Sequence, residues 1–481
     1  MRKRLISICI LLTFLCSGCG QQQEKQVLSG NAASDSVTSS DVNAEQEAEA
    51  DASKEAEETV AESEGSDSEK EMEAEADAAK EVPILRDCYE QAMGGYIGCA
   101  VTGTEIDDPK VFEIMTTHFN AVTLGNELKP DAIFGYSNGK HPGLEETELN
   151  GVTMEVPKMD FSRAERMLDK IYDWNQANPE KQLKVRGHVL VWHSQTPEWF
   201  FHEDYDKEKP YVTTEVMNLR LEWYIKSVLQ HFTGEDSKYK DMFYGWDVLN
   251  EAVSDGTGTY RSEKENASEA LSNNTHGSNS SWWAVYQSEE YIINAFTYAN
   301  KYAPESLELY YNDYNECNLI KRNGILALLQ TVKDHEGAPG EGTRISGMGM
   351  QGHYNMDGPS SSDIEYSIKE YSKVVGKVQI TELDMRASDS YTGTEESKLE
   401  EYEAQRKRYN MIYYGIKSAI NTGDDVQFDG ITFWGTVDHY SWLQSRSDVG
   451  GGNTTGLACC PLLFDENYQP KPCFYVFADS K

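Results

Sequence analysis

The chain has 481 residues, of which 39% are hydrophobic, and it carries a formal net charge of −38. This length is enough for one large domain with additional segments. The charge argues against nucleic acid as a partner, because a phosphate backbone requires a Lys/Arg-rich surface. A neutral polymer such as a polysaccharide is not repelled by an acidic protein.

Residues 1–18 have the pattern of a secretion signal. A basic start, Arg2 to Arg4, precedes an apolar run at 5–15 that is too short to span about 30 Å of hydrocarbon. The run ends in LCSGC, which resembles a bacterial lipoprotein signal with Cys19 as the acylated residue, although Cys16 stands where Leu is usual. We therefore expect a protein outside the cytoplasm that is anchored to the bacterial cell envelope by lipid on Cys19. Plain secretion is the alternative.

Residues 19–82 are strongly acidic and contain no Phe, Trp or Tyr. Such a segment buries too little apolar surface to offset the entropy of ordering, and its charges repel one another. We predict a disordered spacer, followed by one catalytic domain at 83–481. The six Cys of that domain form no CxxC pair, so we treat them as structural and expect no metal and no cofactor.

Within 83–481, short apolar runs alternate with amphipathic stretches. We expect strands at 96–100, 121–124, 184–191, 243–249, 308–311, 346–350, 378–380 and 431–433. Among the expected helices are 161–177, 214–232, 289–302 and 399–420. Strands that alternate with helices imply βαβ units and a parallel sheet, and eight units indicate an α/β fold of the (β/α)8 TIM-barrel type.

Polar and aromatic side chains follow seven of these predicted strands. In chain order they are Asn126, Glu127, Lys129, Trp192, His193, Gln195, Asn250, Glu251, Asn312, Asp313, Gln351, His353, Glu382, Asp384, Trp434 and Asp438. Barrel active sites lie at the carboxyl ends of the strands, whereas a doubly wound sheet places its ligand near one switch point. The insertions at 135–160 and 255–281 also follow strands, and they either wall a cleft or are neutral surface additions.

Glu251 and Glu382 stand at the ends of the fourth and seventh predicted strands. Hydrolysis of a glycosidic bond requires two carboxyl groups, one to protonate the leaving oxygen and one to attack the anomeric carbon or activate water. The proton donor must stay protonated, which a neighbouring carboxylate favours. An eight-stranded barrel is narrow enough for two such side chains to approach one another across its mouth.

The residues around this pair resemble the motifs of glycoside hydrolase family 10 xylanases. WDVLNEA at 246–252 is similar to the acid/base signature of that family, and ITELD at 380–384 is similar to its nucleophile signature. Five further blocks follow the order of the family: NELK at 126–129, RGHVLVWHSQTP at 186–197, YNDYN at 311–315, GMQGH at 349–353 and ITFWG at 431–435. The resemblance covers residues 91–475.

The resemblance implies a retaining endo-β-1,4-xylanase with Glu251 as acid/base and Glu382 as nucleophile. It implies that Asn250 binds the sugar 2-hydroxyl, and that His353 and Asp384 orient Glu382. Subsites on the non-reducing side would be lined by Asn126, Glu127, Lys129, His188, Trp192 and Gln195. Gln351 would support the site, and Trp434 and Trp442 would pack on sugar rings.

Several of these residues also have plain structural interpretations. His188 could be a barrel-interior histidine and Trp246 a core residue, while His193 and His118 are expected to be structural and Asn312 and Asp313 to brace the site. The expected partners are xylan or xylo-oligosaccharides, with no nucleic acid, a monomeric state and membrane contact only through the lipid. Another β-1,4-glycanase, cellulase-like, is one alternative, and a non-catalytic glycan-binding lipoprotein is another.

Overall fold

The computed structural model describes residues 82–478 except 263–279, 389, 393, 422–424 and 446–459. The predicted signal peptide, Cys19 and the spacer up to residue 81 therefore lie outside the described residues. Most of the insertion at 255–281 and Cys459 lie outside them too.

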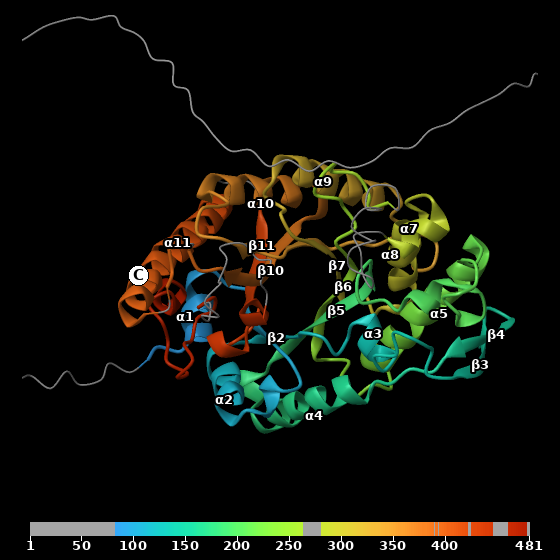
Figure 1. Ribbon diagram of the computed structural model, residues 1–481, viewed down its shortest axis with the longest axis horizontal. Helices are drawn as coiled ribbons and strands as arrows, with labels where there is room; N and C mark the ends of the chain where they lie inside the picture. The colour runs from blue at the N-terminus through green and yellow to red at the C-terminus, as the bar shows by residue number, and fades with distance from the viewer. Residues whose placement is uncertain are drawn as a thin grey trace, which may run out of the picture. The chain divides into compact units, whose positions relative to one another are not determined.

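Eight parallel strands form a closed barrel (Figure 1), as the sequence predicts. Neighbouring strands pair in chain order, and the last pairs with the first through Cys99 and Phe433. The barrel strands are β1 (Tyr96–Val101), β2 (Ala121–Leu124), β5 (Lys184–Trp192), β6 (Phe243–Asn250), β7 (Glu308–Asp313), β8 (Gly347–Met350), β10 (Lys377–Met385) and β11 (Gln427–Phe433).

Three of these strands run further than their apolar residues indicate. Asn250 belongs to β6, Asn312 and Asp313 to β7, and Glu382 and Asp384 to β10, so these residues lie within strands and not after them. The strands continue through these polar residues because side chains on neighbouring strands form hydrogen bonds with them. A two-residue strand, β9 (His353–Tyr354), pairs with the end of β10 and sets His353 opposite Asp384.

Helices surround the barrel in Figure 1. The predicted helices appear, within a few residues, as α4 (Ser162–Ala177), α5 (Thr214–Thr233), α8 (Glu290–Tyr302) and α11 (Glu395–Asn421). The others are α1 (Leu85–Ala92), α2 (Pro109–His118), α3 (Pro130–Ile133), α7 (Ser281–Tyr286), α9 (Leu319–Asp334), α10 (Ser361–Val375) and α12 (Phe474–Ala478). Short 3-10 turns occur at Glu105–Asp107, Pro179–Lys181, Glu198–Phe201, Glu203–Tyr205, Asp438–Tyr440 and Trp442–Ser445.

The insertion at 135–160 contains an antiparallel hairpin, β3 (Leu144–Leu149) and β4 (Val152–Pro157), which the sequence analysis missed. The turn between the strands is Asn150-Gly151, and both residues have positive φ. Asn-Gly between two extended runs is a strong hairpin signal, so the pattern was present in the sequence. Much of the hairpin is exposed, which explains why its apolar alternation is weak.

Trp246 is a core residue, as predicted, with its side chain fully buried. Its ring lies against Gly187 of β5, where a β-carbon would come within 2.0 Å of the indole, and it stacks on Phe243. His118 is also structural, and it packs between Phe464 and Phe474. It is the last residue of α2.

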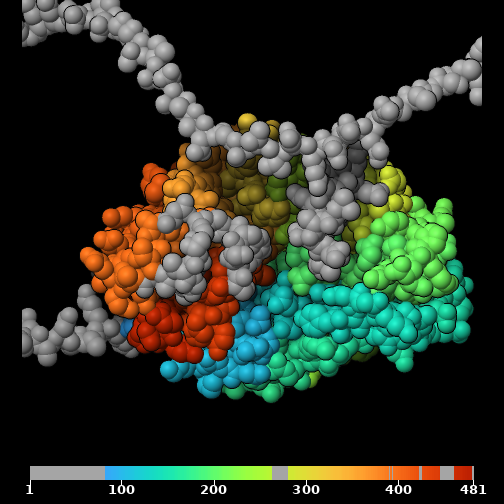
Figure 2. Space-filling view, viewed as in Figure 1, coloured from blue at the N-terminus to red at the C-terminus, as the bar shows by residue number. Residues whose placement is uncertain are grey.

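The two ends of the catalytic domain lie together. Blue residues from the start of the domain and red residues from its end are side by side on the face seen in Figure 2, in keeping with the pairing of β1 with β11. This closure completes the barrel. Within the part of the chain that the structure describes, no helix is long and apolar enough to cross a bilayer.

Candidate active site

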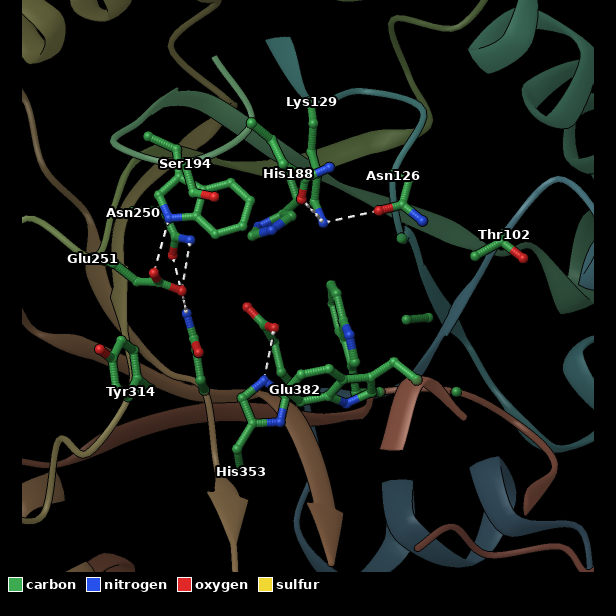
Figure 3. Close-up of a pocket in the computed structure, with 18 of the residues that line it drawn as sticks. Thr102, Asn126, Lys129, His188, Ser194, Asn250, Glu251, Tyr314, His353 and Glu382 are labelled. Carbon is green, nitrogen blue, oxygen red and sulfur yellow. Dashed lines mark hydrogen bonds and ion pairs between the residues drawn. The ribbon is translucent and has the colours of Figure 1, made fainter. Parts of the chain in front are cut away.

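A cavity of about 870 Å³ opens at the carboxyl ends of the barrel strands. Glu251 and Glu382 both line it, and in Figure 3 their carboxyl groups point into the same space, one from just after β6 and the other from β10. The other predicted site residues that line it are Asn126, Lys129, His188, Trp192, Gln195, Asn250, Gln351, His353, Trp434 and Trp442. The fold therefore gathers residues that are spread over most of the domain sequence.

Glu251 directly follows β6, and three N–H donors hold its carboxyl group. Oε1 accepts hydrogen bonds from Gln351 Nε2 at 2.9 Å and Asn250 Nδ2 at 3.2 Å, and Oε2 accepts one from Trp192 Nε1 at 2.9 Å. Each carboxyl oxygen can accept two hydrogen bonds. Oε2 therefore retains a lone pair that can carry a proton. His193, predicted as structural, lies close by, with Nδ1 3.9 Å from Oε2.

Glu382 projects from β10 and is 5% exposed. Its Oε1 accepts a hydrogen bond from Asn312 Nδ2 at 2.8 Å, and its Oε2 lies 3.1 Å from His353 Nε2. Burial raises the pKa of Glu382, but the His353 hydrogen bond, the charges of His188 and His353 and the Asn312 hydrogen bond outweigh it and lower the pKa. The net effect keeps Glu382 ionised, as a nucleophile requires.

His353 lies between two carboxylates. Its Nδ1 is 2.9 Å from Asp384 Oδ1, and its Nε2 faces Glu382. Burial lowers the pKa of His353, but Asp384 and Glu382 raise it well above the usual value. Asp384 in turn accepts a hydrogen bond from Trp442 Nε1 at 2.7 Å. This chain of contacts fixes the imidazole orientation and supplies a positive charge beside Glu382.

Asn312 directly connects Asn250 of β6 with Glu382 of β10, a more specific role than the bracing expected from the sequence. Its Nδ2 donates to Asn250 Oδ1 at 2.9 Å as well as to Glu382, and its Oδ1 accepts from Thr381 Oγ1 at 2.6 Å. The strand β8 has Gly349 at this level, where a β-carbon would come within 2.3 Å of Asn312 Oδ1. Only glycine leaves room for this amide.

Lys129 lines the cavity between Asn126 and Gln195. Its Nζ donates to Asn126 Oδ1 at 3.0 Å and Gln195 Oε1 at 3.1 Å, and it lies 5.2 Å from the Trp192 ring centroid. Burial lowers the pKa of Lys129, although the carboxylates of Glu382, Asp131, Glu251 and Glu127 oppose this effect. An ammonium group with side-chain oxygens around it suits binding of sugar hydroxyls.

Glu127 is placed differently from the sequence prediction. The cavity as the described residues form it is not lined by Glu127, whose carboxylate accepts from the backbone N–H groups of Gly103 at 2.8 Å and Asn126 at 3.2 Å. These contacts hold the loops after β1 and β2 together. Its role as a sugar contact stays a prediction.

His188 lines the cavity from β5, and Asp247 of the neighbouring strand β6 holds its imidazole. Its Nδ1 is 3.0 Å from Asp247 Oδ2, and Asp247 forms a buried ion pair with Arg186 at 2.6 Å. Its imidazole also meets the Trp434 ring edge to face at 5.5 Å. His188 is therefore both a satisfied interior histidine and a cavity residue, so the two interpretations from sequence are compatible.

The cavity has further lining residues that were not singled out from sequence: Thr102, Glu105, Ser194, Tyr314, Asn315 and Tyr440. They lie in loops after strands, and their types carry no signal distinct from ordinary loop residues. Ser194 belongs to the RGHVLVWHSQTP block, and Tyr314 and Asn315 belong to the YNDYN block, so for these three only the blocks gave a signal. Asp438, noted after the last strand, instead pairs with Lys471 at 2.9 Å in a buried ion pair.

Among residues 82–478, as far as they are described, no group of three or more His, Cys, Asp or Glu side chains could hold a metal ion. The ionisable groups that line the cavity include carboxyl, imidazole and ammonium groups.

Replacing His353 with glutamine is expected to move the acidic limb of the kcat/KM pH profile to higher pH. The change removes the positive charge and the Nε2 contact that lower the pKa of Glu382, so that pKa rises and ionisation requires a higher pH. His231→Gln is the control, because the Nε2 of that histidine also lies 3.0 Å from a carboxylate, that of Glu165, but His231 does not line the cavity. An unchanged acidic limb in His353→Gln would contradict the assigned tuning.

A parallel barrel whose strand ends bring the carboxyl groups of Glu251 and Glu382 and three indoles into one cavity has the arrangement of a glycoside hydrolase. The family model of Glycosyl hydrolase family 10 matches residues 84–480, and the chain belongs to this family.

Relatives with curated names support this assignment. Endo-1,4-beta-xylanase B of Paenibacillus barcinonensis is 31% identical over 398 residues, which cover 82% of this chain and 97% of the relative. The bifunctional endo-1,4-beta-xylanase XylA of Ruminococcus flavefaciens is 32% identical over 379 residues, which cover 79% of this chain but 32% of that longer protein.

Solved structures are similar as well. The CBM22-1 and GH10 modules of Clostridium thermocellum endo-1,4-beta-D-xylanase 10B, in complex with xylohexaose, give a TM-score of 0.63 at 28% identity, covering 82% of this chain and 67% of that one. Xylanase B of Clostridium stercorarium F9 gives a TM-score of 0.61 at 27% identity. The match covers 83% of this chain and 100% of that one.

Proposed function

We propose that the protein is an endo-β-1,4-xylanase that hydrolyses internal β-1,4-xylosidic bonds of xylan with retention of anomeric configuration. The observation that carries this proposal is that Glu251 and Glu382 lie in one cavity, each held in place by hydrogen-bond donors. The names of the relatives supply the substrate class.

In the first step Glu382 attacks the anomeric carbon while Glu251 protonates the glycosidic oxygen. The C–O bond to the leaving chain breaks, and an ester between the sugar and Glu382 forms. Both oxygens of Glu382 accept one hydrogen bond, so each keeps a lone pair for attack. We propose that Asn250 binds the sugar 2-hydroxyl as positive charge develops on the ring. The contact of Asn250 with Asn312, which also donates to Glu382, supports this role.

In the second step Glu251, now a carboxylate, accepts a proton from water, and the oxygen of that water attacks the anomeric carbon. The ester to Glu382 breaks and the enzyme returns to its starting state. Two successive inversions at the same carbon give net retention, for which the two carboxyl groups should be about 5–5.5 Å apart.

The test is proton NMR of the anomer first released from a xylo-oligosaccharide. We expect the β-anomer first, with product lengths that show internal cleavage. The α-anomer first would contradict the double displacement. Faster release of reducing sugar from carboxymethylcellulose than from xylan would instead favour the cellulase-like alternative, and inactivity on every glycan would favour a binding protein.

We also propose that the enzyme is monomeric and acts outside the cytoplasm, held at the cell envelope by lipid on Cys19. The support is the basic start, the apolar run and the LCSGC sequence. An enzyme that partitions with membranes equally well after Cys19→Ser would contradict the anchor, and release of the unchanged chain into the medium would favour plain secretion.

A further inference from the structure

We propose that Arg261 is a positioning residue that fixes the main chain of Glu251 and couples it to Tyr314 on the cavity wall. This inference rests on the proposed role of Glu251 as acid/base. It concerns the described start of the insertion that follows β6, a segment to which the sequence assigned only a choice between cleft wall and neutral surface.

The backbone of Glu251 has an unusual conformation that needs support. Its φ is +55°, in the left-handed region that residues with a β-carbon rarely adopt. Such a conformation persists where the surrounding structure holds it, and it is found frequently at functional sites. With this backbone conformation, the carboxyl group of Glu251 meets the side chains of Trp192 and Gln351.

Both sides of this residue are held by hydrogen bonds. The Glu251 N–H donates to Asn312 O at 2.9 Å, and the Glu251 carbonyl accepts from Arg261 Nε at 2.7 Å. The next N–H, of Ala252, donates to Tyr311 Oη at 3.0 Å. Arg261 therefore holds the peptide group between Glu251 and Ala252, whose rotation would swing the carboxyl group.

Arg261 reaches this carbonyl because the chain folds back on itself after the acid/base. Its N–H donates to Ala252 O at 2.8 Å, and Val253 forms an antiparallel bridge with Tyr260. The turn rests on α9, where Gly324 leaves room for the backbone of Gly258. Arg261 is 4% exposed, so its guanidinium is set within this turn and does not extend into solvent.

The same guanidinium also holds a cavity wall residue. Arg261 Nη2 donates to Tyr314 Oη at 2.7 Å, and Tyr314 Oη donates to Asp255. Lys321 Nζ lies 4.2 Å from the Tyr314 ring centroid and 2.9 Å from Asp255 Oδ1. Tyr314 is thus fixed from behind, and its other side faces the cavity.

Tyr314 and Glu251 lie at one end of the cavity, and Thr102 lies at the opposite end (Figure 3). With Asn126 and Lys129 on the Thr102 side as the non-reducing subsites, Tyr314 flanks the sugar that leaves. One arginine therefore links the contact with the leaving sugar to the group that protonates its oxygen.

A purely structural arginine and a positioning arginine predict different kinetics. A sugar alkoxide is a poor leaving group, so cleavage of a sugar–sugar bond depends strongly on proton donation to the leaving oxygen. 2,4-Dinitrophenolate is a good leaving group that departs without a proton, so its release depends little on the acid. A displaced acid/base therefore slows hydrolysis of xylotetraose far more than formation of the glycosyl-enzyme from 2,4-dinitrophenyl β-xylobioside. A general loss of folded enzyme slows both reactions equally.

The experiment measures both reactions for Arg261→Gln, Arg261→Lys and Tyr314→Phe, with circular dichroism and thermal unfolding to quantify folded protein. We expect kcat/KM for xylotetraose to fall by about 10²-fold in Arg261→Gln, the effect typical of a misplacement near 1 Å, with the dinitrophenyl substrate within about threefold of wild type. Arg261→Lys, which retains one donor, and Tyr314→Phe should show smaller losses with the same selectivity.

Arg220→Gln is the matched control. Arg220 is 5% exposed and also donates to main-chain carbonyls, those of Phe200 and His202, but it does not touch the cavity residues described above. We expect both reactions of this variant to keep the same ratio. Equal losses on the two substrates in Arg261→Gln and Arg261→Lys, or no loss, would overturn the inference. Glu251→Ala serves as a reference, because its failure to show selectivity would count against the proposed acid/base and not against Arg261 alone.

Discussion

Glu382→Ala is expected to reduce kcat on xylan by at least about 10⁴-fold, the scale at which loss of a covalent nucleophile is felt. Glu251 does not take its place, since it is held by its own three donors across the cavity. The loss should extend to 2,4-dinitrophenyl β-xylobioside, because an activated leaving group still requires a nucleophile. Steady-state kinetics on both substrates measures it.

Stereochemistry gives this variant a second readout. Azide is small enough to occupy the space that the carboxylate leaves, and it would attack the activated substrate from the face that Glu382 occupies. A single displacement inverts the anomeric carbon, so the product expected from Glu382→Ala is the α-xylobiosyl azide. A β-azide, or hydrolysis at the wild-type rate, would contradict the nucleophile assignment.

Glu222→Gln is a suitable control for the loss of a buried carboxylate. Glu222 is 6% exposed, close to the 5% of Glu382, but it lies on α5 and accepts hydrogen bonds from Lys301, Tyr302 and Asn150 outside the barrel. Its replacement should lower the thermal unfolding temperature and leave kcat unchanged. This comparison separates the chemistry of Glu382 from the general cost of removing a buried charge.

The strand positions and the meeting of Glu251 and Glu382 in one cavity could be predicted from the sequence for a physical reason. Barrel strands are covered on both faces, so β6 and β10 read as buried runs, and βα units place their ends on one face. Glu251 and Glu382 stand at such ends with distinctive neighbours. The Asn-Gly turn of the hairpin at 144–157 was also a signal in the sequence. The hairpin was not predicted because apolar and polar residues alternate only weakly in its exposed strands.

The contacts that prepare the site could not be predicted in the same way. Asn312 of β7 bridges Asn250 of β6 and Glu382 of β10. The space for its amide depends on Gly349 of a fourth strand, β8. Arg261 lies in a turn whose path is set by packing on α9. Local propensity carries no information on such long-range pairings. Residue type and spacing therefore indicated where the site lies but not which hydrogen bonds position its carboxyl groups.

Glu251→Ala is expected to lower kcat/KM for xylotetraose by roughly 10²- to 10⁴-fold, the usual contribution of a general acid. Removal of the carboxyl group leaves the N–H groups of Trp192, Asn250 and Gln351 facing the space, and none of these can supply a proton at neutral pH. The first step on 2,4-dinitrophenyl β-xylobioside should remain fast, because that leaving group departs without a proton.

The second step then becomes limiting in this variant, because no base activates water. The glycosyl-enzyme ester on Glu382 should accumulate, and a burst of dinitrophenolate should precede a slow steady state. Azide, which needs no base, should accelerate turnover and give the β-azide, since it completes a second inversion on the ester. The two variants therefore predict azides of opposite configuration from the same substrate. Equal sensitivity of both substrates to Glu251→Ala, or the α-azide from it, would contradict the division of roles between the two carboxyl groups.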